Sequence, residues 1–357
     1  MRTVEHTRQG EAAQVLTLRE EPRRPAPGPG PGPGRGEVLV RLLVRPVHPG
    51  DLVGVEGMPG QPELESEQQP EQQPEARIPG VEGMGVVESV GTDVHAPRPG
   101  QRVAVFPAPG TWSDFVVVPA ALAVPVPDGV SDETAALMLV NPLTLRMLYR
   151  ALEDALRGRK GPVLQTAAGS SVGRLVSAAA DRHGLELINL VRSTSGAEKV
   201  RTLHPSQPVI ATCDDDWQGQ VRRHAGERGV QVVLDSVGGA MTLELSGLLA
   251  DGGTLVSYGQ LGSGTTPLEA LRLVARGLTV RGVSILHWMN RTAEERAQDV
   301  AFAQDLAQSS PDLLQVAGSY DLADFKAAVE HARRPAKSGT VLLTTPLTAD
   351  SGQGAAR

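Results

Sequence analysis

The stretch Pro162-Val-Leu-Gln-Thr-Ala-Ala-Gly-Ser-Ser-Val-Gly173 decides the fold that we expect for this chain. A short apolar run gives way to small residues, and a segment of helical character then continues to His183. This order is typical of a strand, a tight turn and a helix whose N-terminus can receive a phosphate group. A second apolar run follows at residues 185–191, so the segment predicts a βαβ unit.

More strand signals continue the pattern towards the C-terminus. Apolar runs separated by helix-length stretches lie at residues 207–211, 230–235, 253–258 and 278–285. The alternation predicts a doubly wound parallel sheet.

The two ends of the chain have a different character. Residues 1–128 are β-rich, with apolar runs such as 37–44 and 85–90 punctuated by Gly and Pro. After Arg291 we expect a helix, a short strand near Val316, a helix over 323–333 and a last strand over 340–344. This tail is predicted to fold back onto the first part of the chain.

Two low-complexity segments interrupt the β-rich part. Residues 25–34 are Pro and Gly, with one Ala, and residues 61–75 are mostly Gln, Glu and Pro. Neither can bury enough apolar surface to fold alone, so we expect loops there.

Composition limits the classes of function. With 357 residues, two domains are expected. The 41 acidic and 34 basic residues give a net charge of −7, which argues against nucleic-acid or anionic-membrane partners. Cys213 is the single cysteine and cannot form an internal disulfide, which favours a reducing compartment. No apolar run approaches the roughly 20 residues of a membrane span, so a cytoplasmic location is predicted.

The turn after the first strand of the βαβ unit is the candidate dinucleotide site. Small side chains allow close approach of a diphosphate, and the helix N-terminus supplies N–H groups. The turn departs from the G-x-G-x-x-G pattern, since Ala168 and Ser170 stand where the first two glycines would be. A turn required only for tight packing is the alternative.

The end of the second strand indicates which dinucleotide binds. Arg192 and Ser193 stand there, where a carboxylate would accept from a bare ribose. An arginine and a hydroxyl fit a 2′-phosphate through charge-assisted hydrogen bonds, so NADPH is favoured over NADH. A solvated surface charge is the alternative for Arg192.

Several blocks resemble the trans-2-enoyl-thioester reductases, zinc-free members of the medium-chain dehydrogenase/reductase superfamily that are close to quinone oxidoreductases. The resemblance covers nearly the whole chain outside the two low-complexity segments. The blocks are Val140-Asn-Pro-Leu-Thr-Leu-Arg-Met-Leu148, Gln165-Thr-Ala-Ala-Gly-Ser-Ser-Val-Gly173, Ile188-Asn-Leu-Val-Arg192, Gly253-Thr-Leu-Val-Ser-Tyr-Gly259 and Arg281-Gly-Val-Ser-Ile-Leu-His-Trp288.

The resemblance implies an α/β fold in which a Rossmann domain, residues 129–290, joins a β-rich GroES-like catalytic domain, residues 1–128 and 291–357. It also implies site residues in the cleft between the domains. The cofactor-binding set is Asn141, Gly169, Ser170, Ser171, Val172, Gly173, Arg192, Ser193, Tyr258 and Gly259. Thr111, Trp112 and His287 would line the substrate pocket, and Thr144 and Trp288 would be catalytic. His48 is a further catalytic candidate, because an imidazole can donate a hydrogen bond or a proton. The alternative for Trp112 and Trp288 is that they are core aromatic residues with no role in the pocket.

The departures from the family pattern concern the proton donor and the metal. The tyrosine of enoyl-thioester reductases is missing, since residues 55–60 read Val-Glu-Gly-Met-Pro-Gly and no tyrosine precedes Arg146. His48 replaces the asparagine usual in zinc-free relatives and could donate to a developing oxyanion, or be structural. His48 and Glu82 lack a convincing third ligand, so no metal is predicted.

These observations predict an NADPH-dependent, zinc-independent reductase that transfers a hydride to a small molecule, either an activated C=C bond of an enoyl-thioester or enone, or a quinone. The alternative is a catalytically silent NADPH-binding sensor or partner-binding protein. The β-branched strand over residues 278–285 is expected at a sheet edge, where self-pairing would form a homodimer.

Overall fold

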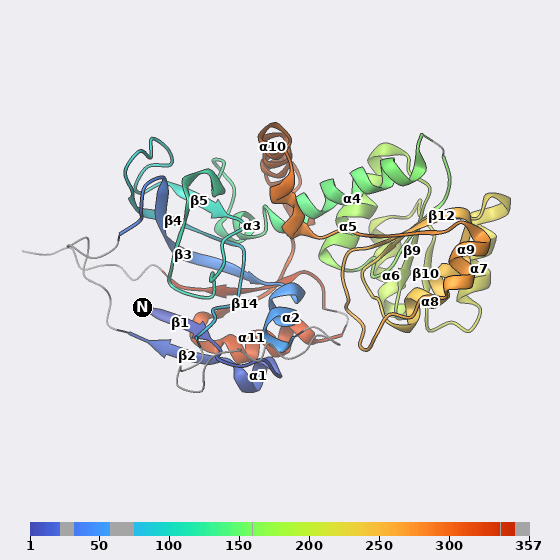
Figure 1. The fold of residues 1–357 in the computed structure, drawn as a ribbon, viewed down its shortest axis with the longest axis horizontal. Helices are drawn as coiled ribbons and strands as arrows, with labels where there is room; N and C mark the ends of the chain where they lie inside the picture. Colours follow the sequence, from blue (N-terminus) through green and yellow to red (C-terminus); the bar gives the residue numbers. More distant parts are fainter. Residues whose placement is uncertain (22–31, 58–74, 159, 336, 347–357) are drawn as a thin grey trace, which may run out of the picture.

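A computed structural model describes residues 1–21, 32–57, 75–158, 160–335 and 337–346. The chain forms two halves that lie side by side along the long axis, one β-rich and one with a parallel sheet (Figure 1). The two low-complexity segments of the sequence fall largely outside the described residues. In the part of the chain that is described, no helix is long and apolar enough to cross a membrane.

The parallel half contains one six-stranded sheet with the order β10-β9-β8-β11-β12-β13. All pairings in it are parallel, and the order reverses direction at β8, so the predicted doubly wound sheet is confirmed. Its elements are β8 (Val163–Gln165), α5 (Ser171–His183), β9 (Leu187–Val191), α6 (Thr194–Leu203), β10 (Val209–Ala211), α7 (Trp217–Ala225), β11 (Val230–Asp235), α8 (Ala240–Leu248), β12 (Leu249–Ser257), α9 (Ala270–Arg276) and β13 (Thr279–Gly282).

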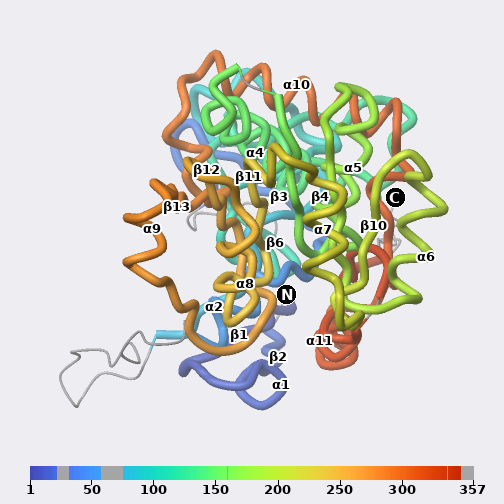
Figure 2. The backbone as a smooth tube through the Cα atoms, turned by 90° about the vertical axis from the view of Figure 1, so that its right-hand side faces the viewer, coloured from blue at the N-terminus to red at the C-terminus, as the bar shows by residue number. Residues whose placement is uncertain are grey.

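The last strand of this sheet is shorter than predicted. β13 ends at Gly282, and Ile285–Asn290 form a 3-10 helix in place of the end of the predicted strand. The hydroxyl of Ser284 accepts from the N–H of Leu286 and so starts the new turn. The strand is nevertheless at the sheet edge, as expected, with α9 beside it (Figure 2).

The β-rich half contains a seven-stranded sheet built from both ends of the chain. β15 pairs antiparallel with β3, with Val341 opposite Val47, so the prediction that the tail folds back is confirmed. The strands are β3 (Glu37–Val47), β4 (Gly83–Val90), β5 (Arg102–Val105), β6 (Phe115–Pro119), β7 (Ala123–Pro125), β14 (Val316–Asp321) and β15 (Thr340–Thr344), and β1 (Arg2–Glu5) pairs with β2 (Thr17–Glu20) beside them. The helices of this half are α1 (Ala12–Val15), α2 (Pro49–Glu56), α3 (Asp132–Ala136) and α11 (Phe325–Arg333).

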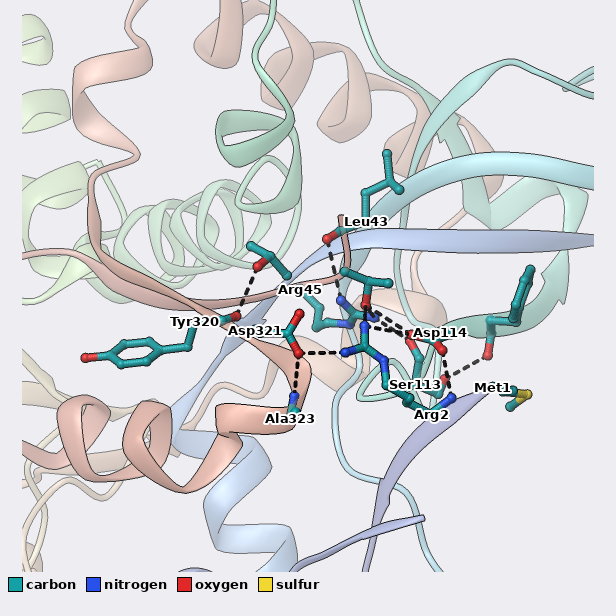
Figure 3. A network of polar contacts seen from close by, with 12 residues as sticks. Met1, Arg2, Leu43, Arg45, Ser113, Asp114, Tyr320, Asp321 and Ala323 are labelled. Carbon is teal, nitrogen blue, oxygen red and sulfur yellow. Dashed lines mark hydrogen bonds and ion pairs between the residues drawn. The ribbon is translucent and has the colours of Figure 1, made fainter. Parts of the chain in front are cut away.

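A buried polar network ties the N-terminal strand to the tail (Figure 3). Arg45 is fully buried, and its Nη2 donates to Thr345 Oγ1 at 2.8 Å and to the carbonyl of Ser113 at 2.6 Å. Burial lowers the pKa of Arg45 to about 9. Arg2 Nη1 lies 2.6 Å from Asp321 Oδ1. These contacts hold the two chain ends together, since a buried guanidinium requires acceptors for its N–H groups.

Two helices lie at the junction of the halves. α4 (Val140–Leu156) packs on α5, and α10 (Ala293–Ser309) packs on α4 (Figure 1). The largest apolar core cluster contains Met84 and Phe106 of the β-rich half together with Leu175 and Val232 of the parallel half. The two halves therefore share a core. The domain boundaries at 128/129 and 290/291 stay predictions.

Candidate active site

The turn between β8 and α5 has the geometry of a phosphate-binding loop. Ala167 adopts a φ of 48°, and the Ser170 hydroxyl caps α5 by accepting from Gly173 N at 3.1 Å. A Cβ on Gly173 would lie 2.5 Å from the carbonyl oxygen of Ala167, so the close turn requires glycine there. The space above Gly169 is open, with no atom within 4 Å of a Cβ built on it. The turn thus leaves room for a ligand at the helix N-terminus.

The carboxyl ends of β11 and β12 lie beside this turn. Thr166 Oγ1 donates to the buried Asp235 carboxylate at 3.0 Å, which fixes the end of β8 against the end of β11. The buried hydroxyls of Ser236 and Tyr258 face each other, and neither has a hydrogen-bond partner outside this pair in the described part of the chain. Burial raises the pKa of Tyr258 to about 12, so this hydroxyl stays protonated. Unpartnered polar atoms at the carboxyl edge of a doubly wound sheet fit a dinucleotide.

The end of β9 places the predicted 2′-phosphate residues at the surface. The Arg192 side chain is exposed and makes no hydrogen bond or ion pair to the residues that the structure describes. Ser193 is the N-cap of α6, and its hydroxyl accepts from Gly196 N at 3.2 Å. Ser193 therefore has a structural role that the sequence analysis did not foresee, while Arg192 is available to an anionic ligand.

His48 and Glu82 form a buried pair in the β-rich half. His48 Nε2 lies 2.7 Å from Glu82 Oε2, and Glu82 is fully buried. Burial lowers the pKa of His48, but the hydrogen bond and charge of Glu82, with the charge of Asp51, outweigh it and raise the pKa above 6.5. The imidazole is thereby held in its protonated form to higher pH than a free histidine.

Glu82 also connects this pair to α4. Its Oε1 accepts from the N–H groups of Leu139 and Val140, at 2.9 and 2.8 Å, at the start of the helix. Asn141 and Thr144 are buried in the first turns of the same helix. The Thr144 hydroxyl donates to the Val140 carbonyl at 2.7 Å, so its proton is used within the helix.

The remaining predicted pocket residues are not brought together in an open cleft. Thr111 and Trp112 are fully buried, and Trp112 Nε1 donates to the Pro46 carbonyl, so Trp112 packs as a core aromatic. Trp288 is also buried, and its Nε1 donates to Asp299 at 3.1 Å. His287 is exposed. Trp112 and Trp288 thus have buried rings and occupied indole N–H groups, and their roles in the pocket stay predictions.

The Trp288 indole belongs to a hydrogen-bonded cluster between the two halves, which we call the Asp299 clamp and which consists of Asp299, Arg146, Arg150 and Trp288. Asp299 on α10 is fully buried and receives hydrogen bonds from Arg146 and Arg150 of α4, at 3.0 and 2.6 Å. Burial alone would raise the pKa of Asp299, but the hydrogen bonds from these arginines outweigh it and lower the pKa. The Trp288 ring lies 6.0 Å from Phe106, which belongs to the β-rich half. Trp288 therefore joins α4, α10 and the β-rich half.

A zinc site does not fit these side chains. His48 and Glu82 are bonded to each other, and the second Glu82 oxygen is occupied by two backbone N–H groups. Cys213 is exposed, 3.7 Å from Thr194 in the parallel half. Among the described residues, no group of three or more His, Cys, Asp or Glu side chains could hold a metal ion.

A cavity of about 430 Å³ opens at the opposite edge of the parallel sheet. Asp181, Gln207 and Pro208 line it, near the amino ends of β9 and β10. Asp181 accepts from Ser206 and Gln207 and is hydrogen-bonded to His204, so its carboxylate is occupied. Ligands of doubly wound sheets bind at the carboxyl edge, so we assign this cavity no role in the site.

Some residues of the site had no detectable signal in the sequence. The sequence does not single out Asp235 and Asp299, because important partners lie far along the chain: Thr166 is 69 positions from Asp235, and Arg146 is 153 positions from Asp299. Glu82 stands out only as half of an incomplete metal-ligand pair with His48, and its hydrogen bonds to Leu139 and Val140 appear only in the fold. Arg174 and Lys337, described below, are likewise joined only by the fold.

A Rossmann-type sheet with a phosphate-binding turn, covered by a β-rich half that places a histidine–glutamate pair at the junction, defines a dehydrogenase/reductase architecture. Two family models agree: residues 34–128 match the alcohol dehydrogenase GroES-like domain, and residues 171–303 match the zinc-binding dehydrogenase domain. The chain belongs to the medium-chain dehydrogenase/reductase family and is an oxidoreductase.

Individual relatives support this placement. The mitochondrial enoyl-[acyl-carrier-protein] reductase of Bos taurus is 27% identical over 314 residues, which cover 86% of this chain and 80% of the relative. A mycobacterial quinone oxidoreductase is 28% identical with a TM-score of 0.73, over 97% of this chain and 100% of that one. A mycobacterial protein complexed with NADPH is 28% identical with a TM-score of 0.79, with the same coverage.

Proposed function

We propose that this protein is an NADPH-dependent reductase that works without zinc and delivers a hydride to an activated C=C bond, in an enoyl-thioester or enone, or to a quinone. The observation that carries the proposal is the Glu82 carboxylate, which holds His48 and caps α4, the helix that packs on the dinucleotide-binding helix α5. Glu82 thus links the candidate proton donor, at the start of α2, to α4, which packs on the helix that follows the nucleotide turn. Relatives named as enoyl reductases and quinone oxidoreductases support the reaction class.

The cofactor, when bound, supplies the hydride. The turn from Gly169 to Gly173 would hold its diphosphate, and Arg192 would pair with its 2′-phosphate. Asn141, Tyr258 and Gly259 would line the remainder of the cofactor site.

The protein would supply the proton and the stabilisation of negative charge. Reduction of a conjugated alkene or a quinone places charge on an oxygen of the substrate, and a protonated imidazole can donate to that oxygen. His48 is held protonated by Glu82, and in the absence of the family tyrosine it is our candidate donor. The tyrosine position, residues 55–60, lies partly outside the described residues.

A direct assay tests the proposal. The protein is mixed with NADPH and, in turn, enoyl-thioesters, enones and quinones, and the nicotinamide absorbance is followed. We expect oxidation of NADPH with at least one class. Tight NADPH binding without turnover of any acceptor would instead support the catalytically silent NADPH-binding protein, which the missing tyrosine favours.

We also propose that the protein is a homodimer joined through β13. This strand pairs with β12 on one side and has no strand on its other side among the described residues. Large apolar side chains are exposed beside it: Leu271 (84%) and Val274 (81%) on α9, and Leu286 (60%) after the strand. A free edge next to an exposed apolar surface is a self-association site. The cytoplasmic location stays a prediction.

A further inference from the structure

Two basic side chains, one buried and one half-buried, lie where α5 meets the loop before β15. Arg174, in the first turns of α5, is 4% exposed, and Lys337 is half-buried in the loop. Arg174 Nη1 donates to Gln315 Oε1 and to Ser338 Oγ, and Ser171 at the start of α5 is hydrogen-bonded to Thr340 at 2.9 Å. The parallel half and the tail therefore meet at the N-terminus of α5.

These cations have no counter-charge. Arg174 Nε and Nη2 are buried and find no acceptor in the described chain, and neither Arg174 nor Lys337 forms an ion pair there. Burial lowers the pKa of Arg174, and burial together with the charge of Arg174 lowers the pKa of Lys337. Lys337 Nζ donates to the Gly339 carbonyl at 2.9 Å, but no carboxylate in the described part of the chain balances either charge. A buried guanidinium next to a half-buried ammonium is unfavourable unless an anion joins them.

The location favours an anion that bears phosphate. Side chains of a helix lean towards its N-terminus, so Arg174 covers the first turn, on the same face as Ser170 and Ser171. The N–H groups of Ser171 and Val172 at that end have no acceptor within the described part of the chain. A helix N-terminus and a planar guanidinium fork are matched to phosphate oxygens.

We propose that Arg174 and Lys337 complete a diphosphate subsite, in which one cation from each half of the protein binds the diphosphate of the dinucleotide. This inference rests on the proposed function, because the ligand is the diphosphate of the proposed cofactor. Ligand binding would supply the missing counter-charge, and Lys337, in the tail, would couple the tail to the nucleotide.

The test compares two cofactors that share the diphosphate and differ at the 2′-position. Affinities of Arg174→Gln and Lys337→Gln for NADPH and NADH are measured by titration, with thermal unfolding to verify folding. We expect each variant to bind both cofactors about ten- to a hundredfold more weakly, with the NADPH/NADH ratio unchanged. Arg182→Gln is the matched control, because Arg182 lies on the same helix and also bonds the tail, at Ser310, but at the far end.

Inorganic diphosphate provides a readout that does not require cofactor. We expect it to bind the wild-type protein in calorimetry and to lose affinity in the two variants. Folded variants with wild-type affinity for diphosphate and both cofactors would overturn the subsite; if Arg174→Gln fails to fold, Lys337→Gln alone decides. Diphosphate binding by a wild-type protein that binds neither cofactor would refute the proposed function and leave the subsite standing.

Discussion

Glu82 holds His48 through a single carboxylate oxygen, Oε2, which lies 2.7 Å from the imidazole Nε2, while the other oxygen caps α4. One buried carboxylate thus favours the protonated histidine and positions α4, a helix next to the proposed cofactor site. The pair resembles a base-and-orienter arrangement in which the second group fixes the protonation state of the first.

The activity should depend on pH through His48. Its pKa lies above 6.5, so the protonated donor is present below that pKa and is lost as the pH rises through it. We expect the rate to fall on the alkaline side and Glu82→Gln to move this fall to lower pH, because the amide removes the charge that favours the imidazolium. His48→Gln should lower kcat about 10²- to 10⁴-fold. A pH profile unaltered in Glu82→Gln would contradict the role of the pair.

The same pair should affect stability in the same direction. A raised pKa in the folded protein contributes stability that is fully present below pH 6.5 and is lost as the pH rises through the raised value. Urea unfolding at a series of pH values from below 6.5 upward would measure the change in the free energy of unfolding. We expect this free energy to depend less on pH in His48→Gln.

The cofactor preference should rest on Arg192. Arg192→Ala is expected to lower NADPH affinity about ten- to a hundredfold, which corresponds to roughly 1.5–3 kcal/mol, and to leave NADH affinity unchanged. Titration with each cofactor measures this, with Arg222→Ala, an exposed arginine on α7, as the control. Equal preference before and after the change would remove the 2′-phosphate assignment.

Metal should be irrelevant to the reaction. We expect full activity after treatment with a chelator and no stoichiometric zinc by elemental analysis, because His48 and Glu82 are committed to each other and to α4. Zinc at one equivalent whose removal abolishes activity would show the assignment to be wrong.

The dimer should depend on the apolar surface of α9. The double change Leu271→Asp and Val274→Asp places charge on two of the most exposed apolar positions and should give a monomer in sedimentation. The control is Leu203→Asp. Leu203 is 53% exposed and ends α6, which connects β9 and β10 at the other end of the sheet from β13, so this change should leave the dimer intact. A wild-type protein that sediments as a monomer at micromolar concentration would refute the dimer.

The Asp299 clamp should support the domain junction. Asp299→Asn leaves Arg146 and Arg150 without their carboxylate and is expected to cost roughly 2–3 kcal/mol of unfolding free energy, reduced by the partial exposure of both arginines. Asp305→Asn, exposed on the same helix, is the control. Indistinguishable unfolding midpoints would show that the clamp contributes little.

The sequence by itself determined the elements and the nucleotide turn. Apolar periodicity, glycine and helix caps are local properties, so the strands β8 to β12 and the helix α5 could be predicted from residues close in the chain. The sequence also predicts that the tail folds back onto the first part of the chain, but its pairing with β3 is a long-range contact that only the fold shows. The length of β13 could not, because a capping serine two residues later starts a 3-10 turn.

Only the tertiary structure decided which side chains share a site. The sequence pairs His48 with Glu82 only as an incomplete ligand set, and the fold shows that the two side chains are hydrogen-bonded to each other. Arg174 meets Gln315 across 141 positions, and no local pattern links these two residues. It also decided that Trp112 and Trp288 are buried, which an aromatic in a sequence does not reveal. The physical reason is that charge pairing and burial depend on distance in space, and that distance is set by how the two halves pack and not by the residues next to each group.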